Sequence, residues 1–316
     1  MIVRALVSLS SLVAAASIAS AAVTTFPITM TGAQEVPGAG DTDGGATGTL
    51  TVDSGTNMIS WNFTYTNIAA PNAMHIHAAQ DGVSGGVVIN LGTATSGGAG
   101  TLISQTPTSA ANIAAVLANP QNFYVNIHNA AFGGGAVRGQ IPKILDVVLV
   151  GCQEVPSPGD SDGSASGQVW FDTGVDKVFW NLTYSGIARP SAMHIHTGTA
   201  GVAGGVFIGL GVATSGGAGT LISEVATTDA SLDAIIANPS GFYMNIHNAA
   251  FPGGAIRGQI GVPLPFVLGD LNCDGAVDAA DLAVLLGAWG TSGPGDLNGD
   301  GTVDAADLAL LLGSWS

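Results

Sequence analysis

The sequence predicts a mainly β protein with two tandem antiparallel β-sandwich domains and a small α-helical, EF-hand-like C-terminal domain. Three observations lead to this prediction. One long stretch occurs twice, each copy alternates short apolar segments with glycine-rich turns, and the C-terminal part combines regularly spaced aspartates with two apolar segments of helical length. The 316 residues suffice for two or three domains, and with 47% hydrophobic residues each can bury a core.

Most of the chain is a duplication. Residues 28–141 align with residues 147–260 without a gap after a shift of 119 residues, and 66 of the 114 aligned positions are identical. This period is too long for a solenoid repeat, so each copy is expected to have its own core. The chain is expected to divide into a signal peptide (1–21), two β-sandwich domains (22–141 and 142–260), a linker (261–268) and a C-terminal domain (269–316).

Within a copy, the pattern is mostly that of short strands between glycine-rich turns. The candidate strands of the first copy are Thr47–Val52, Met58–Tyr65, Val87–Leu91, Phe123–His128 and Ala136–Ile141. The turn Asp53–Asn57 makes the first two a hairpin. Ser109–Ala118 is the one helical segment, and Asn119-Pro120 ends it. Short strands with a single helix are typical of an antiparallel β-sandwich.

Composition limits the partners and cross-links that the chain can form. It has 6 basic against 22 acidic side chains, a formal net charge of −16. Because lysine and arginine bind polyanions, this balance excludes nucleic acid as a partner. The two cysteines, Cys152 and Cys273, are too few for a disulfide framework, and the sequence leaves open whether they pair.

The N-terminus has the pattern of a secretory signal peptide. Arg4 precedes an apolar run that ends near Ile18, and the small residues Ala19-Ser20-Ala21 follow. The run is shorter than the roughly 20 residues of a bilayer span, which favours cleavage over a membrane anchor. We therefore expect a secreted product, extracellular or at the cell surface, without a membrane span.

Three motifs recur in both copies. The first is Gln34-Glu35-Val36-Pro37, repeated as Gln153-Glu154-Val155-Pro156, and the second is Met74-His75-Ile76-His77, repeated as Met193-His194-Ile195-His196. The third has two parts, Asn126-Ile127-His128 and Arg138-Gly139-Gln140-Ile141, which are repeated as Asn245-Ile246-His247 and Arg257-Gly258-Gln259-Ile260. On these motifs, each copy resembles the chordin-type (CHRD) domain family, whose members occur in extracellular developmental regulators and in many secreted bacterial proteins. That family is not defined by a catalytic reaction, so the resemblance favours a protein that is not an enzyme.

All six histidines lie in these motifs. On a strand, residues two apart point to the same face, so His75 and His77 lie side by side, opposite Met74 and Ile76. If the strand of His128 packs nearby, three imidazoles could share Zn²⁺ or Cu²⁺. The second copy repeats the set as His194, His196 and His247. The alternative is that each ring donates a hydrogen bond to a backbone carbonyl.

The order of a His-x-His strand, a distant histidine and a late arginine also resembles the copper half of a Cu/Zn superoxide dismutase. The sequence lacks an aspartate flanked by histidines to hold zinc and a bridging histidine between His77 and His128. A copper or zinc oxidoreductase that uses the two histidine sets is therefore an alternative function.

The C-terminal segment has the spacing of a calcium-binding loop, twice. From Asp270 on there are eight aspartates and neither lysine nor arginine. Oxygen-bearing side chains occupy loop positions 1, 3, 5, 9 and 12, glycine occupies position 6, and position 7 offers a backbone carbonyl, which is the EF-hand arrangement. The predicted ligands of two Ca²⁺ ions are Asp270, Asn272, Asp274, Ala276, Asp278 and Asp281, and Asp296, Asn298, Asp300, Thr302, Asp304 and Asp307.

Each loop leads into an apolar helical segment, Leu282–Trp289 or Leu308–Trp315, and no comparable helical segment precedes it. With these features and aspartate at position 12, residues 269–316 resemble a type I dockerin. The resemblance implies binding to a cohesin-like domain of an extracellular partner through loop positions 10 and 11. These positions hold Ala279, Ala280, Ala305 and Ala306, where Ser/Thr pairs are common.

Together these features favour a secreted, non-enzymatic modular protein, in which a calcium-binding dockerin-like tail tethers two CHRD domains to an extracellular partner. The alternatives are the metal oxidoreductase and an accessory role in polysaccharide catabolism, which the association of dockerins with polysaccharide-degrading enzymes implies.

Overall fold

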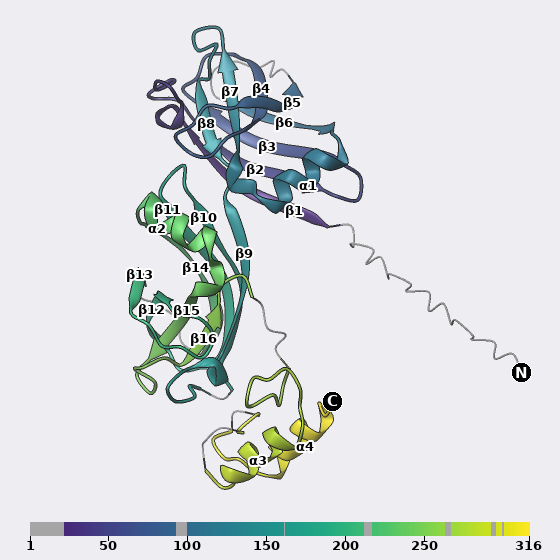
Figure 1. Cartoon of the computed structure of the whole chain (residues 1–316), viewed down its shortest axis with the longest axis vertical. Helices are drawn as coiled ribbons and strands as arrows, with labels where there is room; N and C mark the ends of the chain where they lie inside the picture. Colours follow the sequence, from purple (N-terminus) through teal and green to yellow (C-terminus); the bar gives the residue numbers. More distant parts are fainter. Residues whose placement is uncertain are drawn as a thin grey trace, which may run out of the picture.

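The computed structural model describes residues 22–92, 100–160, 162–211, 217–262, 267–291, 295–298 and 300–316. The predicted signal peptide, residues 1–21, lies outside the described residues. Two β domains and a small helical domain follow one another along the long axis of the molecule (Figure 1). Within the described ranges, no helix has the length and apolar character needed to cross a membrane.

The first β domain is a single eight-stranded sheet in the order β5-β4-β7-β8-β1-β2-β3-β6, with antiparallel neighbours. Its strands are β1 (Val23–Thr31), β2 (Gly45–Asp53), β3 (Met58–Thr66), β4 (Pro71–Ala78), β5 (Gly86–Gly92), β6 (Gly100–Pro107), β7 (Phe123–Asn129) and β8 (Val137–Gln140). Its helical segments are η1 (Gly32–Gln34), α1 (Ala110–Ala118) and η2 (Pro120–Asn122).

The second β domain repeats this order as β13-β12-β15-β16-β9-β10-β11-β14. Its strands are β9 (Lys143–Val150), β10 (Ser164–Asp172), β11 (Lys177–Ile187), β12 (Pro190–Thr197), β13 (Val206–Gly211), β14 (Gly217–Ala226), β15 (Phe242–Asn248) and β16 (Ile256–Gln259). Its helical segments are η3 (Gly151–Gln153), α2 (Asp229–Ala237) and η4 (Pro239–Gly241).

The sheet of each domain is continuous and barrel-like, whereas the sequence led us to expect a sandwich of two layers. The two halves of the first sheet are joined where β1 pairs with β8 through Thr31 and Arg138. The second sheet has the same junction between Val150 and Arg257. Because one strand pairing bridges the two halves, they form a curled sheet instead of two detached layers. The prediction of mainly β domains with antiparallel strands is confirmed.

The predicted elements of the first copy are present, with ends shifted by a few residues. In β3, Ile59, Trp61, Phe63 and Tyr65 are buried and alternate with more exposed residues, as expected for a strand with one face on a core. Helix α1 begins after Ser109, whose hydroxyl accepts a hydrogen bond from the backbone N–H of Asn112.

The helical domain consists of two loop–helix units. Helices α3 (Ala279–Gly287) and α4 (Ala305–Gly313) pack around a four-residue core made of Val277, Leu285, Val303 and Leu311. The two units close on each other, because Val303 pairs with the backbone after α3 and Val277 pairs with Ser316 after α4. This reciprocal pairing makes the two loops structurally equivalent.

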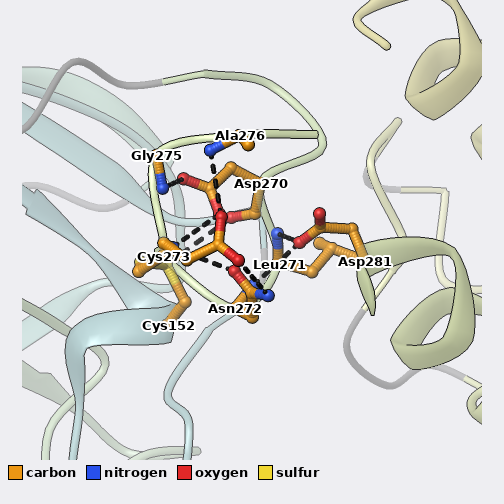
Figure 2. Close-up of a disulfide and its surroundings, with 9 residues drawn as sticks. Cys152, Asp270, Leu271, Asn272, Cys273, Gly275, Ala276 and Asp281 are labelled. Carbon is orange, nitrogen blue, oxygen red and sulfur yellow. Dashed lines mark hydrogen bonds between the residues drawn. A yellow bond between two sulfur atoms is a disulfide. The ribbon is translucent and has the colours of Figure 1, made fainter. Parts of the chain in front are cut away.

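A disulfide between Cys152 and Cys273 links η3 of the second β domain to the first loop of the helical domain (Figure 2). The Cα atoms are 6.0 Å apart, and the two cysteines are separated by 121 residues. Both cysteines are departures from the internal repeats, since Ala33 occupies the equivalent place in the first β domain and Gly299 the equivalent place in the second loop. The disulfide therefore distinguishes one β domain and one loop from their copies.

The two β domains meet at the turn between β10 and β11. Gly174 in this turn lies so close to Gln34 and Gln140 that a Cβ atom would collide with both side chains. The neighbouring Asp172 is 2% exposed, and burial raises its pKa to about 7, with a further contribution from Asp81 and other carboxylates. The contact between the domains thus encloses an acidic group.

We predict that Asp172→Asn stabilises the protein above pH 7 and has little effect near pH 4. The raised pKa means that the folded state holds a proton that the unfolded state releases, so this contribution is complete below about pH 4 and is lost as the pH rises through about 7. Asparagine can still accept the hydrogen bond from the Gly174 N–H. Thermal unfolding from pH 4 to pH 8 measures the difference.

The matched control is Asp53→Asn, at the equivalent turn of the first β domain. Hydrogen bonds from Thr56 and Gly55 lower the pKa of Asp53, so this change is expected to lower stability at neutral pH. A loss of stability in Asp172→Asn at pH 8 would contradict the assignment of the buried acid.

We also predict that the double variant Cys152→Ala, Cys273→Gly keeps its domains folded but loses the fixed position of the helical domain. Each substitution introduces the residue that the repeat has at the equivalent position. Removing a cross-link over 121 residues is expected to cost about 2–4 kcal/mol of stability. Small-angle scattering should show a larger maximum dimension. An unchanged dimension would show that noncovalent contacts suffice to hold the helical domain.

Candidate metal sites

The three histidines of each β domain come together on one face of the sheet. β4 carries His75 and His77, and β7 pairs with it so that His128 lies opposite Ala73. Met74 and Ile76 point into the core on the other face, as the strand pattern predicted. One ring nitrogen from each histidine lies within 4.8 Å of the other two. In the second domain, His194, His196 and His247 form the same cluster.

Backbone carbonyls fix the tautomers of two rings in the first cluster. His77 Nδ1 lies 2.9 Å from the Gly85 carbonyl oxygen, and His128 Nδ1 lies 3.1 Å from that of Gly133. A carbonyl oxygen can only accept, so each Nδ1 carries the proton and the neutral ring keeps a lone pair on Nε2. The hydrogen bonds expected from the sequence are thus present at these two rings, and each leaves a metal-ligating atom available.

The Nε2 atom of His77 is buried and has no hydrogen-bond partner among the described residues. His128 Nε2 lies 3.0 Å from His75 Nδ1 and 2.9 Å from Asn126 Oδ1. Burial and the neighbouring rings lower the pKa of His75, and burial lowers the pKa of His128, so the neutral forms are favoured. The cluster therefore presents lone pairs from neutral rings, as transition metals require.

A buried arginine stabilises the arrangement of the first histidine cluster. Arg138 donates hydrogen bonds to the carbonyl oxygens of Gln80 and Val83, both at 2.8 Å. Its guanidinium lies 3.6 Å from the centroid of the Tyr124 ring, and Tyr124 stacks on His77 with ring planes 9° apart. The stack holds the His77 ring in place and fixes the loop that follows β4.

The buried Glu35 completes this support. Burial raises its pKa to about 7, against the charge of Arg138 and a hydrogen bond with the Asn126 side chain. Gly135 makes room for it, since a Cβ atom there would collide with the carboxyl group. We did not predict a role for Glu35, Tyr124, Asn126 or Arg138, although the motifs shared by both copies contain three of them and Tyr124 is also retained, as Tyr243.

The second domain repeats these contacts closely. His196 and His247 hydrogen-bond through Nδ1 to the carbonyl oxygens of Gly204 and Pro252, each at 3.0 Å. His194 Nδ1 lies 3.0 Å from His247 Nε2, and His196 Nε2 is buried without a hydrogen-bond partner in the described part of the chain. The duplication has thus preserved the geometry as well as the residue types.

In the helical domain, the predicted calcium ligands line two loops (Figure 2 shows the first). The Asp270 carboxylate accepts hydrogen bonds from the backbone N–H groups of Asp274 and Gly275, at 3.1 and 3.0 Å. The buried Asp281 accepts hydrogen bonds from Leu271, Asn272 and Asp278. The second loop reproduces these contacts with Asp296 and Asp307.

The loop side chains are hard oxygen donors, the kind that Ca²⁺ prefers. Gly275 and Gly301 occupy position 6 with φ of 94° and 93°, a conformation that favours glycine and allows the sharp turn. Partial burial raises the pKa of Asp270, with the charges of Asp281 and Asp274 adding to it. A divalent cation would relieve this concentration of negative charge, so the residues fit calcium.

The predicted partner-contact residues are exposed. Ala279, Ala280, Ala305 and Ala306 form the first turns of α3 and α4 and face solvent. The far ends of the helices expose apolar side chains, namely Leu286, Trp289, Leu312 and Trp315, each about half exposed. The helical domain thus presents the same two kinds of surface on both units.

Comparison with protein families identifies the duplicated part of the chain. The model of the CHRD domain matches residues 26–141 and 145–260, which are the two β domains. Comparison with curated proteins gave no match. Because the matched residues make up most of the chain, the protein belongs to the CHRD domain family and contains two tandem CHRD domains.

Proposed function

We propose that this is a secreted, non-enzymatic modular protein whose dockerin-like tail binds two Ca²⁺ ions and tethers two CHRD domains to an extracellular, cohesin-like partner. CHRD repeats are consistent with a modular protein that is not an enzyme. The observation that carries the proposal is the equivalence of the two tail loops, each with the same oxygen donors, the same glycine and the same hydrogen bonds.

Charge supports calcium binding by the tail. Eight aspartates lie within residues 270–307, without a lysine or arginine in the tail to offset them. Each ion would be held by the side chains at loop positions 1, 3, 5, 9 and 12 and by the carbonyl of Ala276 or Thr302. Because the described part of the tail has four fully buried apolar residues in its core, we expect folding of this module to depend strongly on the metal.

The exposed surfaces of α3 and α4 support docking. The paired alanines at loop positions 10 and 11 are exposed at the start of each helix, and leucine and tryptophan side chains are exposed at its far end. Apolar area of this kind favours a protein interface. Since the two units are equivalent, a partner could engage either one.

Two other functions remain as alternatives. A copper or zinc oxidoreductase is favoured by the convergence of three histidines in each CHRD domain. An accessory role in polysaccharide catabolism depends on the dockerin resemblance of the tail and would place the CHRD domains beside enzymes that the same partner holds.

We predict that the tail binds two Ca²⁺ ions and that chelation unfolds it. Isothermal titration of the calcium-stripped chain should give a stoichiometry near two, reduced to one by Asp296→Ala and to zero by Asp270→Ala with Asp296→Ala. The matched control is Asp146→Ala, which removes an exposed carboxylate from the second CHRD domain. Identical calcium content in all variants, or a far-ultraviolet spectrum insensitive to chelator, would refute the proposed module.

We further predict that a type I cohesin domain binds the chain only in the presence of calcium. An arginine at position 11 adds charge and bulk to the exposed surface of one unit, so Ala280→Arg or Ala306→Arg alone should retain binding through the other unit. The double variant should lose it. Surface plasmon resonance measures the three variants, and binding that persists in the double variant would place the interface elsewhere.

A further inference from the structure

Each histidine cluster contains a buried ring nitrogen that has no hydrogen-bond partner among the described residues. In the first CHRD domain, the carbonyl oxygens of Gly85 and Gly133 bind the Nδ1 protons of His77 and His128, so the Nε2 atoms of both rings face the cluster as lone pairs. The side chain of Asn126 hydrogen-bonds to Glu35, and its Oδ1 atom faces His128 Nε2 at 2.9 Å. His128 Nε2 has hydrogen-bond partners in the side chains of His75 and Asn126, whereas His77 Nε2 has none among the described residues.

Without a bound cation, such a site lowers the stability of the folded domain. A buried polar atom without a partner destabilises a fold by about 1–3 kcal/mol. His77 Nε2 belongs to a ring that is 8% exposed, and it has no partner among the described residues. The same atom of His196 is in the same situation, in a ring that is also 8% exposed. A metal ion in each cluster would bind the unpartnered Nε2 atom of that cluster. The carbonyl oxygens that accept the Nδ1 protons would hold the ligand rings in the required orientation.

The kind of ligand favours copper over zinc. His75 Nδ1 and His128 Nε2 are 3.0 Å apart, as are His194 Nδ1 and His247 Nε2. These separations are those of an N–H···N hydrogen bond between the two rings, and one bound ion could replace the shared proton. Imidazole nitrogens suit both metals, and Cu²⁺ binds such ligands more tightly than Zn²⁺ does.

The cluster is accessible from one side. His75 and His194 are partly exposed, whereas the other two rings of each set are buried. The Tyr124 ring lies between His77 and the Arg138 guanidinium, and Tyr243 separates His196 from Arg257. An ion could therefore enter past the exposed histidine, and an aromatic ring would stand between the ligands and the buried cation.

We infer that each CHRD domain binds one Cu²⁺ ion through its three histidines, with His75, His77 and His128 as ligands in the first domain and His194, His196 and His247 in the second. The buried carbonyl-bound rings contribute Nε2, and the partly exposed ring contributes Nδ1. These sites are separate from the tail and do not depend on the proposed tethering function.

The test uses the untagged, full-length secreted chain, because all six of its histidines belong to the two clusters and a histidine tag would mask them. Excess Ca²⁺ is added before the titration with Cu²⁺, so that calcium occupies the carboxylates and they do not bind copper. The expected result is two Cu²⁺ ions per chain by elemental analysis after dialysis, with nitrogen hyperfine structure from three imidazoles in the electron paramagnetic resonance spectrum. Equimolar Zn²⁺ should not displace the copper.

Variants separate ligation from folding. His75→Ala removes the partly exposed ring, which hydrogen-bonds to His128, and should lower the copper content to one ion per chain. Adding His194→Ala should lower it to zero while the circular dichroism spectrum stays unchanged. As a second pair, His77→Gln with His196→Gln keeps a side chain of similar reach and should also lose both ions. Two retained copper ions in either double variant, displacement by Zn²⁺, or no bound copper in the wild type would overturn the inference.

Discussion

The buried arginine of each CHRD domain is the constraint on which the site depends. Arg138 is fully buried, and its guanidinium is satisfied largely by backbone carbonyls of the loop that follows β4. Leaving a charge of this size unpaired inside a protein would cost several kcal/mol, so the loop cannot move away. That loop carries Gly85, whose carbonyl orients His77. The position of a proposed metal ligand is thus determined by a cation on the other side of an aromatic ring.

Much of the fold could be predicted from the sequence, because its signals are local. The alternation in Met58–Thr66 marks a strand, Ser109 marks the start of a helix and Asn119-Pro120 its end. The continuous sheet could not be predicted, because it depends on the pairing of β1 with β8 over more than a hundred residues, through Thr31 and Arg138. Neither residue carries a pattern that identifies its partner strand.

The candidate sites also differ in how much of each could be predicted from the sequence. His75 and His77 share a strand face by their spacing alone, and the strand pairing brings His128 to them as the sequence suggested. The supporting residues are harder to find, since Glu35 and Arg138 lie far apart in the chain and meet only through the three-dimensional fold. The proposed calcium loops are the opposite case, because all the predicted donors of one loop lie within twelve consecutive residues.

The disulfide between Cys152 and Cys273 also determines how force would pass through the molecule. The chain enters the second CHRD domain through β9 and reaches Cys152 just after this strand, while Cys273 lies at the start of the helical domain. Tension applied between the ends of the protein would cross the sulfur–sulfur bond and bypass everything from β10 to β16. Under flow or traction the segment from β10 to β16 would therefore remain shielded within a covalent ring, whereas the first CHRD domain and β9 would bear the pull.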